Sequence, residues 1–510
     1  MASRSWRNVS GRAWQPRLSS ASLREARLWL AGATLSSGAI YGLYLVLVAF
    51  LPSHVTKPRI YLFGALQYGD ARPFIFVFAV GLLFACAAIA WRISSNPANA
   101  VLRFWALVPP IVFACALLLT MPLTSRDIFY YTMIGRVLGT YGANPYLVPP
   151  SAFPADPLFQ YTNWPDYTAP YGPLWLLLSA GLTLLGGTSV LWNVVLFKLV
   201  ALLGYLACGG LIWAILRARG RPGLPGVVLW LWNPLVLLEY PGAGHNDVLM
   251  LAGLLLGLWL YVTRRVRLAL AVVTAAAMIK SVAIVALPLL LWHHLPPLGG
   301  WRARGRATMR LLWLPALIVV GTMGPFWAGA AMLGPVNESN HYYSSVGHVV
   351  RIALEWFLAP RLAGNLVRGT IVLALVGSYL LILRRVRGDN DRLLAGVAGT
   401  MFVLIALWPF FVPWYSTWAV ALVATLGSRR RGIQTLVLCA GATLSYLLQL
   451  YLPLRMAVSV EFRSALSALL IFGPFALSFI PWGALPLRRR MPAPTGPLPP
   501  AHAEPQPEVP

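Results

Sequence analysis

The chain has 510 residues, of which 58% are hydrophobic and only 11% charged, and its mean hydropathy is +0.70. A soluble domain carries about 25% charged residues, so this composition excludes an ordinary soluble enzyme. The net charge of +26 would suggest a nucleic-acid partner in a soluble chain. Here the basic residues cluster in short loops between apolar runs, as in the cytoplasmic loops of membrane proteins, and we expect no nucleic-acid partner.

In chain order, the predicted architecture is an all-α polytopic membrane protein with three parts. Residues 1–27 form a basic cytoplasmic segment, 28–482 a transmembrane domain, and 483–510 a disordered, Pro-rich cytoplasmic tail. A helix needs about 20 apolar residues to cross a bilayer, and such runs recur along the domain, which predicts roughly 12 to 14 transmembrane segments. The clearest runs are Leu28–Leu51, Pro73–Trp91, Phe104–Met121, Val190–Leu216 and Leu311–Met332.

The longest polar stretch of the domain is residues 122–172. If the N-terminus lies inside, the third span ends outside, and this stretch becomes an external loop. The next apolar segment, 173–187, is short, and the span after it ends in the basic Arg217–Arg221. We predict that 173–187 lies flat in the external interface, because a crossing there would place the basic loop outside.

Later spans, among them Val227–Tyr240 and Trp414–Leu426, are expected to alternate, except at residues 268–292, which have basic loops on both sides. Either this segment is a broken re-entrant pair, which we favour, or the charge rule fails here. Lys280 lies inside it and is predicted to be the only lysine deep in the membrane. A lysine at that depth costs roughly 2.5–3.5 kcal/mol, which a bound phosphate would offset through a charge-assisted contact.

Acidic residues indicate the reactive face. The chain has 14 Asp and Glu in all, and most are expected at or beyond the outer face. The outer acidic residues are Asp70, Asp127, Asp156, Asp166, Glu239, Asp247, Glu338, Glu355 and Glu461. Chemistry that needs a carboxylate is therefore expected on the extracytoplasmic face of the cell membrane.

Asp127 is the principal candidate because it follows a span directly, beside Arg126 and before Tyr130 and Tyr131. One interpretation is a carboxylate that caps a helix N-terminus. The other is a general base at the bilayer surface, where low dielectric raises its basicity. The residues alone do not decide between them.

Other polar groups accompany Asp127. Each has a simpler explanation, such as an interfacial anchor, a helix cap or an ordinary polar loop. The candidate substrate-binding residues are Arg126, Tyr130, Tyr131, Arg136, Tyr171, Trp175, Glu239, Asn246, Asp247, His341 and His348, and the candidate phosphate-binding residues are Lys280, His245 and Arg351. No spacing typical of a metal site is present, and we expect neither a metal nor a cofactor.

Several short motifs resemble those of the GT-C superfamily of membrane glycosyltransferases. They are Asp127-Ile-Phe-Tyr-Tyr with Gly135-Arg136, Asn144-Pro-Tyr146, Pro170-Tyr-Gly-Pro-Leu-Trp175, Gly244-His-Asn-Asp-Val-Leu-Met250, and Lys280 followed by Pro288. In this order they look most like actinobacterial polyprenol-phosphomannose-dependent α-1,6-mannosyltransferases. The resemblance implies a GT-C-type bundle, interfacial helices in a long external loop, and an aspartate base in that loop, which falls on Asp127.

The function implied is that of an inverting glycosyltransferase. It would move a sugar, with mannose the expected one, from a polyprenyl-phosphate donor to a lipid-anchored glycan, with membrane lipids around it. Asp127 would act as base, and Lys280, His245 and Arg351 would stabilise the leaving phosphate. The alternatives are a transporter or flippase of lipid-linked sugars, a structural partner in a cell-envelope complex, and a related enzyme that uses another polyprenyl-phosphate sugar.

Overall fold

A computed structural model describes residues 20–51, 62, 71–295, 300–333 and 342–480. Throughout this described part, ordered secondary structure is helical apart from two isolated β-bridges. Nine of its helices are long and apolar enough to cross a membrane, and a bent pair, Pro234–Gly242 with Asp247–Val262, makes a tenth if it counts as one span. The expected all-α polytopic membrane fold is confirmed.

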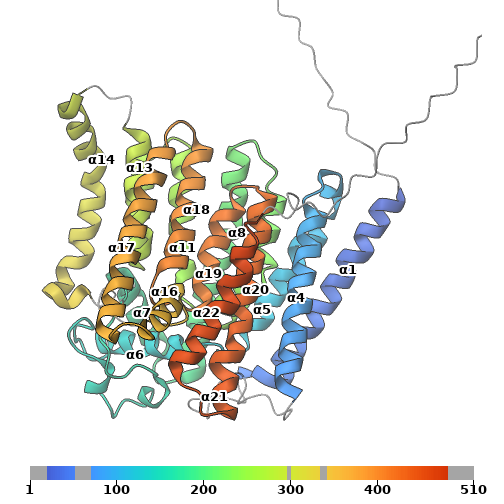
Figure 1. The fold of residues 1–510 in the computed structure, drawn as a ribbon, viewed down its shortest axis with the longest axis horizontal. Coiled ribbons are helices and arrows are strands. Elements are labelled where there is room, and N and C mark those ends of the chain that lie inside the picture. Colours follow the sequence, from blue (N-terminus) through green and yellow to red (C-terminus); the bar gives the residue numbers. More distant parts are fainter. Residues whose placement is uncertain (1–19, 52–61, 63–70, 296–299, 334–341, 481–510) are drawn as a thin grey trace, which may run out of the picture.

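We divide the helices into two series, before and after residues 296–299, which Figure 1 colours from blue to yellow-green and from yellow to red. The first series is α1 (Ser20–Leu43), α4 (Arg72–Ser94), α5 (Arg103–Leu118), α6 (Asp127–Gly139), α7 (Pro173–Gly186), α8 (Val190–Ala218), α9 (Leu224–Leu231), α10 (Pro234–Leu237), α11 (Asp247–Val262), α12 (Val266–Ala277) and α13 (Ala286–His294). The second is α14 (Gly300–Met323), α16 (Val346–Glu355), α17 (Pro360–Arg385), α18 (Asn390–Leu407), α19 (Ser416–Ala424), α20 (Arg429–Tyr446), α21 (Leu452–Arg455) and α22 (Val460–Leu477).

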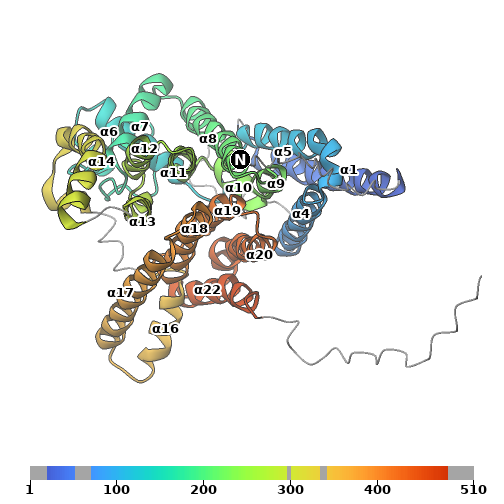
Figure 2. The same cartoon turned by 90° about the horizontal axis from the view of Figure 1, so that it is seen from above.

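Helices at the centre of the bundle are more deeply buried than helices at its edge. Seen from above, α10, α11 and α19 lie near the middle, while α1, α14 and α17 lie at the periphery (Figure 2). In the most apolar part of α8 half of the residues are buried, whereas in α14 and α17 only 11% are. Central helices can therefore hold polar groups away from lipid, and the outer helices present apolar side chains to it.

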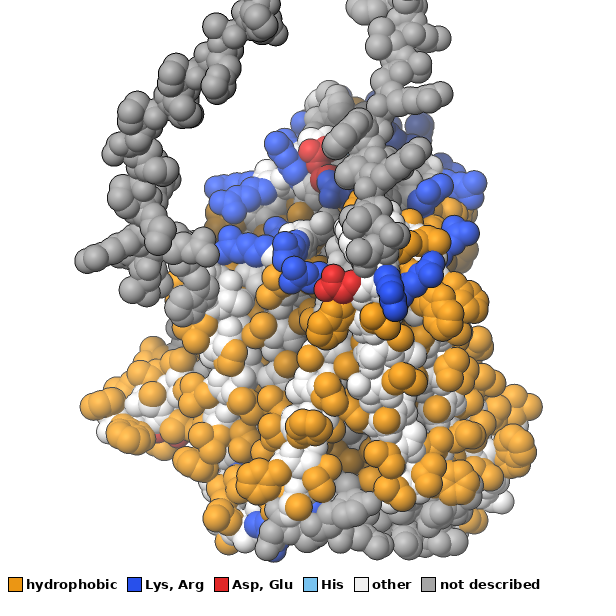
Figure 3. Space-filling view, turned by 90° about the vertical axis from the view of Figure 1, so that its right-hand side faces the viewer, with side chains coloured by type: hydrophobic (Ala, Val, Ile, Leu, Met, Phe, Trp, Pro, Cys, Tyr) orange, Lys and Arg blue, Asp and Glu red, His pale blue; other side chains and the backbone are white. Residues whose placement is uncertain are grey.

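Charge separates the two ends of the bundle. In the face shown in Figure 3, Lys and Arg gather near one end, and a broad hydrophobic band lies beneath them. Figure 1 shows that α1 begins at this basic end, while α6 and α21 lie at the opposite end. This distribution is typical of a polytopic membrane protein.

Several expected spans are shorter than the sequence suggested. The segment that we predicted as a span from Trp414 to Leu426 is a 3-10 turn followed by the nine-residue α19, and α9 has eight residues. Residues 173–187 are helical as α7, which ends at Gly186, and its position in the membrane interface stays a prediction. Short and broken helices thus supply part of the predicted number of segments.

Residues 268–292 form the favoured broken pair of helices. The first helix, α12, ends at Ala277, and α13 begins at Ala286 after a short 3-10 segment. The hydroxyl of Tyr261, just before α12, lies 2.7 Å from Nδ1 of His293 at the end of α13. The pair therefore returns to the end of the bundle at which it began, with Lys280 in its turn.

The expectation that Lys280 is the only lysine deep in an apolar run is wrong. Lys198, within α8, is fully buried. Its ammonium donates to the carbonyl oxygens of Leu117, at 2.6 Å, and Thr120. Since the last carbonyls of a helix lack partners within that helix, Lys198 caps the C-terminal end of α5. The sequence did not indicate this role, because Lys198 lies within an apolar run.

Candidate active site

The loop that follows α5 brings Asp127 to the first position of α6. Oγ of Ser125 donates to Oδ1 of Asp127 at 3.0 Å. The Asp127 side chain remains 20% exposed, although its helix is largely buried. Asp127 is therefore held in place and is still accessible to a substrate, which a cap carboxylate alone does not require.

A sharp bend between α10 and α11 supplies the neighbouring groups. The chain turns by 113° there, after a π-helix that contains Glu239 and Pro241. Gly244 has φ +77°, and a Cβ at that position would lie 2.8 Å from Cδ1 of Ile128 in α6. Glycine is needed for both reasons, and the bend places His245 against the start of α6.

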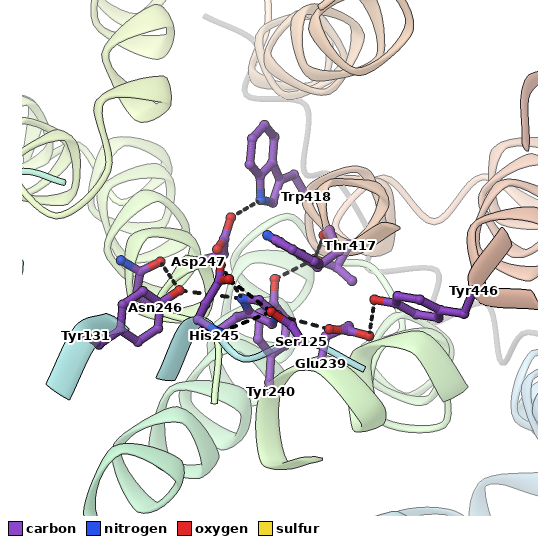
Figure 4. A network of polar contacts seen from close by, with 12 residues as sticks. Ser125, Tyr131, Glu239, Tyr240, His245, Asn246, Asp247, Thr417, Trp418 and Tyr446 are labelled. Atoms are coloured by element: carbon purple, nitrogen blue, oxygen red, sulfur yellow. Dashed lines mark hydrogen bonds and ion pairs between the residues drawn. The ribbon is translucent and has the colours of Figure 1, made fainter. Parts of the chain in front are cut away.

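His245 lies between two carboxylates. Its Nδ1 is 3.7 Å from Oδ2 of Asp127, and its Nε2 is 3.1 Å from Oε2 of Glu239. Glu239 also accepts a hydrogen bond of 2.7 Å from the hydroxyl of Tyr446 (Figure 4). His245 and Glu239 are fully buried, and the imidazole stacks on Trp414 with 4.0 Å between ring centroids. The three residues form a continuous polar path that begins at the accessible Asp127.

A second ion pair lies next to this path. Nζ of Lys280 and Nε1 of Trp418 each donate to Oδ1 of Asp247 at 2.7 Å. The ammonium also lies 5.0 Å from the ring centroid of Tyr415 and 5.5 Å from that of Trp418. Because the Lys280 side chain is still 17% exposed, it combines a fixed position with access.

Two buried polar atoms at this point have unused hydrogen-bonding capacity. Oδ2 of Asp247 and Nδ2 of Asn246 have no hydrogen-bond partner within the described part of the chain. Buried polar atoms are paired in the great majority of cases. Two consecutive residues therefore keep an unpaired buried acceptor and an unpaired buried donor next to the polar path.

The turn that holds Lys280 is also bonded, through the backbone, to the end of loop 122–172 and the start of α7. The amides of Gly172 and Leu174, at the start of α7, donate to the carbonyls of Ile279 and Met278 at 3.1 and 3.0 Å. A Cβ on Gly172 would lie 2.1 Å from the Met278 carbonyl oxygen. Only glycine allows this approach, so α7 and the turn that holds Lys280 fit directly against each other.

Several predicted substrate-binding residues instead hold the loop together. The buried guanidinium of Arg126 donates to Asn163 and to the Tyr161 carbonyl, and the Tyr130 hydroxyl donates to the carbonyl of Tyr167. Such contacts fix a long loop that has few regular hydrogen bonds of its own.

Arg136 has a similar structural role at the far end of α6. It forms a buried ion pair with Asp156, with 2.6 Å between Nε and Oδ2. The Tyr141 hydroxyl donates to the same carboxylate oxygen at 2.8 Å. Partial burial and the Asp156 carboxylate raise the pKa of Tyr141 above its ordinary value, so this hydroxyl remains a donor to more alkaline pH than a free tyrosine.

Tyr131, Tyr171 and Trp175 do gather beside the polar path. The Tyr131 hydroxyl lies 3.4 Å from Oδ1 of Asn246 and 3.5 Å from Nδ1 of His245. Its ring packs edge-to-face on Tyr171 and on Trp175, which is buried. Tyr131 thus joins Asp127 in linking the start of α6 to the α10–α11 bend.

Arg351, predicted to bind phosphate, and His348, predicted to bind substrate, have their recorded contacts elsewhere in the described part of the chain. Arg351 pairs with Glu355 one turn further along α16 and lies over the ring of Tyr342. Nε2 of His348 lies 2.9 Å from the Glu461 carbonyl. None of the contacts recorded in the described ranges joins either residue to Asp127 or Lys280, and His341 falls outside those ranges.

Sequence reasoning missed the contribution of the second series of helices. Trp414, Tyr415, Thr417 and Trp418 come from one short segment, Pro413-Trp-Tyr-Ser-Thr-Trp418, and Tyr446 comes from α20. The hydroxyls of Tyr240 and Thr417 are hydrogen-bonded to each other across the two series (Figure 4). A proline followed by three aromatic residues within six positions was the available signal, and we interpreted it only as the start of a span.

Metal ligands do not assemble around this network. No group of three or more His, Cys, Asp or Glu side chains that could hold an ion is present in the described residues. The expectation of chemistry without a metal stays a prediction.

Comparison with known proteins gives a consistent result over most of the chain. Residues 35–296 match the family described as "Alpha-(1->6)-mannopyranosyltransferase, N-terminal domain", and residues 344–452 match the MptB C-terminal domain. No solved structure matches.

Three curated relatives illustrate the similarity. Alpha-(1->6)-mannopyranosyltransferase A of Mycobacterium tuberculosis is 29% identical over 69% of this chain and 70% of its own. The Corynebacterium glutamicum protein of the same name is 26% identical over 66% and 72%, respectively. Alpha-(1->6)-mannopyranosyltransferase B of Corynebacterium glutamicum is 24% identical over 73% and 67%.

Proposed function

The chain belongs to the alpha-(1->6)-mannopyranosyltransferase family, and we propose that it transfers mannose from a polyprenyl phosphate to a lipid-anchored glycan on the extracytoplasmic face. The curated relatives named above are mannopyranosyltransferases, which supports an enzyme rather than a transporter or a structural partner. The lipid donor, the glycan acceptor and the face of the membrane are our own inferences.

The single observation that carries the proposal is the position of Asp127. Its carboxylate is accessible, faces Nδ1 of His245, and through that ring is linked to the buried Glu239. A carboxylate with a fixed orientation and one open side can accept a proton from an approaching hydroxyl. The buried pair behind it offers a preorganised polar environment for the change of charge.

In the reaction we propose, the acceptor hydroxyl oxygen attacks C1 of the mannosyl group while Asp127 takes its proton. The bond between C1 and the phosphate oxygen breaks, and its electron pair leaves with the polyprenyl phosphate. A single displacement inverts the configuration at C1. One carboxylate suffices for it, unlike the carboxylate pair of glycoside hydrolases.

Lys280 is the group that we propose for the leaving phosphate. Its ammonium is partly exposed and fixed by Asp247, and Tyr415 and Trp418 flank it. A cation placed before the reaction stabilises developing negative charge without reorganisation. His245 adds a polar ring on the same side. Arg351 is left out of this proposal because its contacts are with Glu355 and Tyr342.

The distribution of basic residues supports an extracytoplasmic site. Arginine-rich loops mark the cytoplasmic side of membrane proteins, and these loops gather at the end of the bundle opposite to α6 (Figures 1 and 3). The same argument supports cytoplasmic locations for residues 1–27 and 483–510, of which 1–19 and 483–510 lie outside the described residues.

The test is sugar transfer by the purified full chain in detergent. Radiolabelled polyprenyl-phosphate mannose is offered with a short lipid-linked mannan acceptor, with and without a chelator. We expect the wild type to transfer mannose in both conditions, and Asp127→Asn to be at least about 100-fold slower, the usual size of a general-base contribution.

Asp166→Asn is the matched control, because Asp166 is an exposed carboxylate in the same loop. It should transfer as fast as the wild type. A fully active Asp127→Asn enzyme would exclude Asp127 as the base. Wild-type protein that leaves this donor intact but consumes another polyprenyl-phosphate sugar would correct the sugar, and failure with every such donor would favour the transporter.

A further inference from the structure

A basic hollow lies at the end of the bundle opposite to Asp127. It has a volume of about 640 Å³ and lies between the end of α17, the start of α18 and the start of α20. Five arginines line it, and they are Arg384, Arg385, Arg387, Arg392 and Arg431. Each comes from the first or last turn of a helix or from the loop between α17 and α18, so all five lie at the level where these helices leave the membrane.

The positive charge of the hollow is largely unopposed. Of the two nearby carboxylates, Asp391 is occupied by Arg219 and Arg221, outside the hollow. Asp389 lies 3.8 Å from Nε of Arg392, and both side chains of this pair are more than 60% exposed. Such exposed pairs are weak because water and salt screen them. The hollow therefore attracts an anion.

One arginine is held ready for a ligand. The guanidinium of Arg387 stacks on Trp292, with 4.0 Å between its carbon and the ring centroid. Its Nε is buried and has no hydrogen-bond partner in the part of the chain that the structure describes. Stacking leaves the edge of a guanidinium free, and that edge matches the geometry of a phosphate.

The remaining wall of the hollow is apolar. Ile382, Val386, Ala395, Gly396 and Gly399 line it, and a different face of α17 exposes Leu373, Leu380 and Leu381. The arginines therefore lie at the end of an apolar helix whose other faces are open to lipid. An acyl chain can lie against such a helix, whereas a soluble anion gains nothing from it.

We propose that this hollow binds an anionic phospholipid of the membrane. The phosphate of the headgroup lies among the five arginines, and an acyl chain follows α17. Basic pockets between membrane helices at the headgroup level recognise lipid phosphates in this way. The site is separate from the catalytic network, so the proposal does not depend on the reaction.

The experiment is native mass spectrometry of the full chain in detergent, titrated with phosphatidylglycerol, cardiolipin or phosphatidylcholine. We expect one anionic lipid to be retained at concentrations at which phosphatidylcholine is not. The double variant Arg384→Gln/Arg387→Gln should weaken this binding by roughly 30-fold, as expected for two arginines at a charged surface.

A steric variant tests the shape of the hollow without a change of charge. A Cβ on Gly399 would lie 3.7 Å from Ile382, so the leucine of Gly399→Leu would extend into the space and should also displace the lipid. The control is Arg306→Gln/Arg310→Gln on α14, which removes the same charge from exposed positions outside the hollow. Circular dichroism and gel filtration confirm that each variant is folded.

Three results would overturn the proposal. The control could lose as much lipid as Arg384→Gln/Arg387→Gln, which would indicate general attraction by the basic end. The Gly399→Leu variant could be folded and still retain the lipid, which would show that the lipid does not bind in the hollow. Inorganic phosphate could displace the lipid at equal concentration, which would identify a site for soluble anions.

Discussion

Two carboxylates, Asp391 and Asp247, link the first helix series to the second at opposite ends of the bundle, and they differ in how completely their atoms are paired. At the basic end, Arg219 and Arg221 each bind one oxygen of Asp391 and donate in addition to the carbonyls of Thr425 and Leu426. We call these three residues the clasp. At the site end, Asp247 binds Lys280 and Trp418 through one oxygen only, and its other oxygen is buried without a partner in the described residues.

This difference distinguishes structural ion pairs from functional ones. A saturated pair has no capacity left for a ligand and contributes to stability alone. A pair with unused capacity retains a desolvation penalty that a bound substrate can relieve. Ionic contacts by themselves therefore say little about function, and the unpaired atoms beside them say more.

The largest expected effect is that of Lys280→Met. The Asp247 carboxylate would stay buried with only Trp418 as its partner, and breaking a buried ion pair costs about 3–5 kcal/mol of the free energy of unfolding. Transfer should be lost as well. Unfolding is followed by titration of detergent micelles with sodium dodecyl sulfate.

The double variant Lys280→Met/Asp247→Asn separates the two effects. Removing both charges should restore most of the stability, because no uncompensated carboxylate remains. Transfer should stay lost, since the ammonium for the phosphate is absent. If the double variant regains transfer, Lys280 serves the structure and not the leaving group.

Glu239→Gln is expected to have the next largest effect. Glutamine still accepts the hydrogen bond from Tyr446 but removes the negative charge that faces His245. A buried charge-assisted hydrogen bond contributes about 1.5–3 kcal/mol, so transfer should fall by roughly 10- to 100-fold. Steady-state rates with saturating donor measure it. Unchanged rates would show that the charge of Glu239 does not contribute to transfer.

Asp391→Asn tests the clasp at the basic end of the bundle. The aspartate side chain in the clasp is 47% exposed, so solvent screening limits its contribution to about 1 kcal/mol. The same sodium dodecyl sulfate titration should detect this loss, while the rate of transfer stays at the wild-type value. A slower enzyme would show that the clasp influences the site across the whole bundle.

The smallest effect is expected for Asp389→Asn. This carboxylate is 61% exposed and lies 3.8 Å from Arg392, and asparagine can replace it as the N-cap of α18. Stability should change by less than about 0.5 kcal/mol. A larger change would mean that exposed ion pairs at the basic end contribute more to the free energy of unfolding than their exposure to solvent predicts.

Much of the fold followed from the sequence because lipid imposes strong rules. Apolar length predicted the spans, and basic loops predicted that α7 is a short separate helix and that the segment around Lys280 is a broken pair. The short α19 and the capping role of Lys198 did not follow. Both depend on contacts between distant segments, such as the bonds of Lys198 to the end of α5, which hydropathy does not contain.

The candidate site followed only in part. Asp127, His245 and Lys280 were predicted as separate motifs, and the structure brings them together. Trp414, Trp418 and Tyr446 were missed because their sequence surroundings are ordinary for membrane helices. Arg126 and Arg136 were assigned to substrate, yet they hold the loop, since a buried guanidinium in a long loop satisfies backbone carbonyls and carboxylates first.

The fit between Gly172 and the Met278 carbonyl has a mechanical consequence. Because the amides of Gly172 and Leu174 bind the two carbonyls just before Lys280, we expect the start of α7 and the lysine to move together. An acceptor that pushes α7 aside as it enters would therefore displace the ammonium at the same moment. Binding of the acceptor would thus shift the lysine that we propose for the donor phosphate, through backbone hydrogen bonds alone.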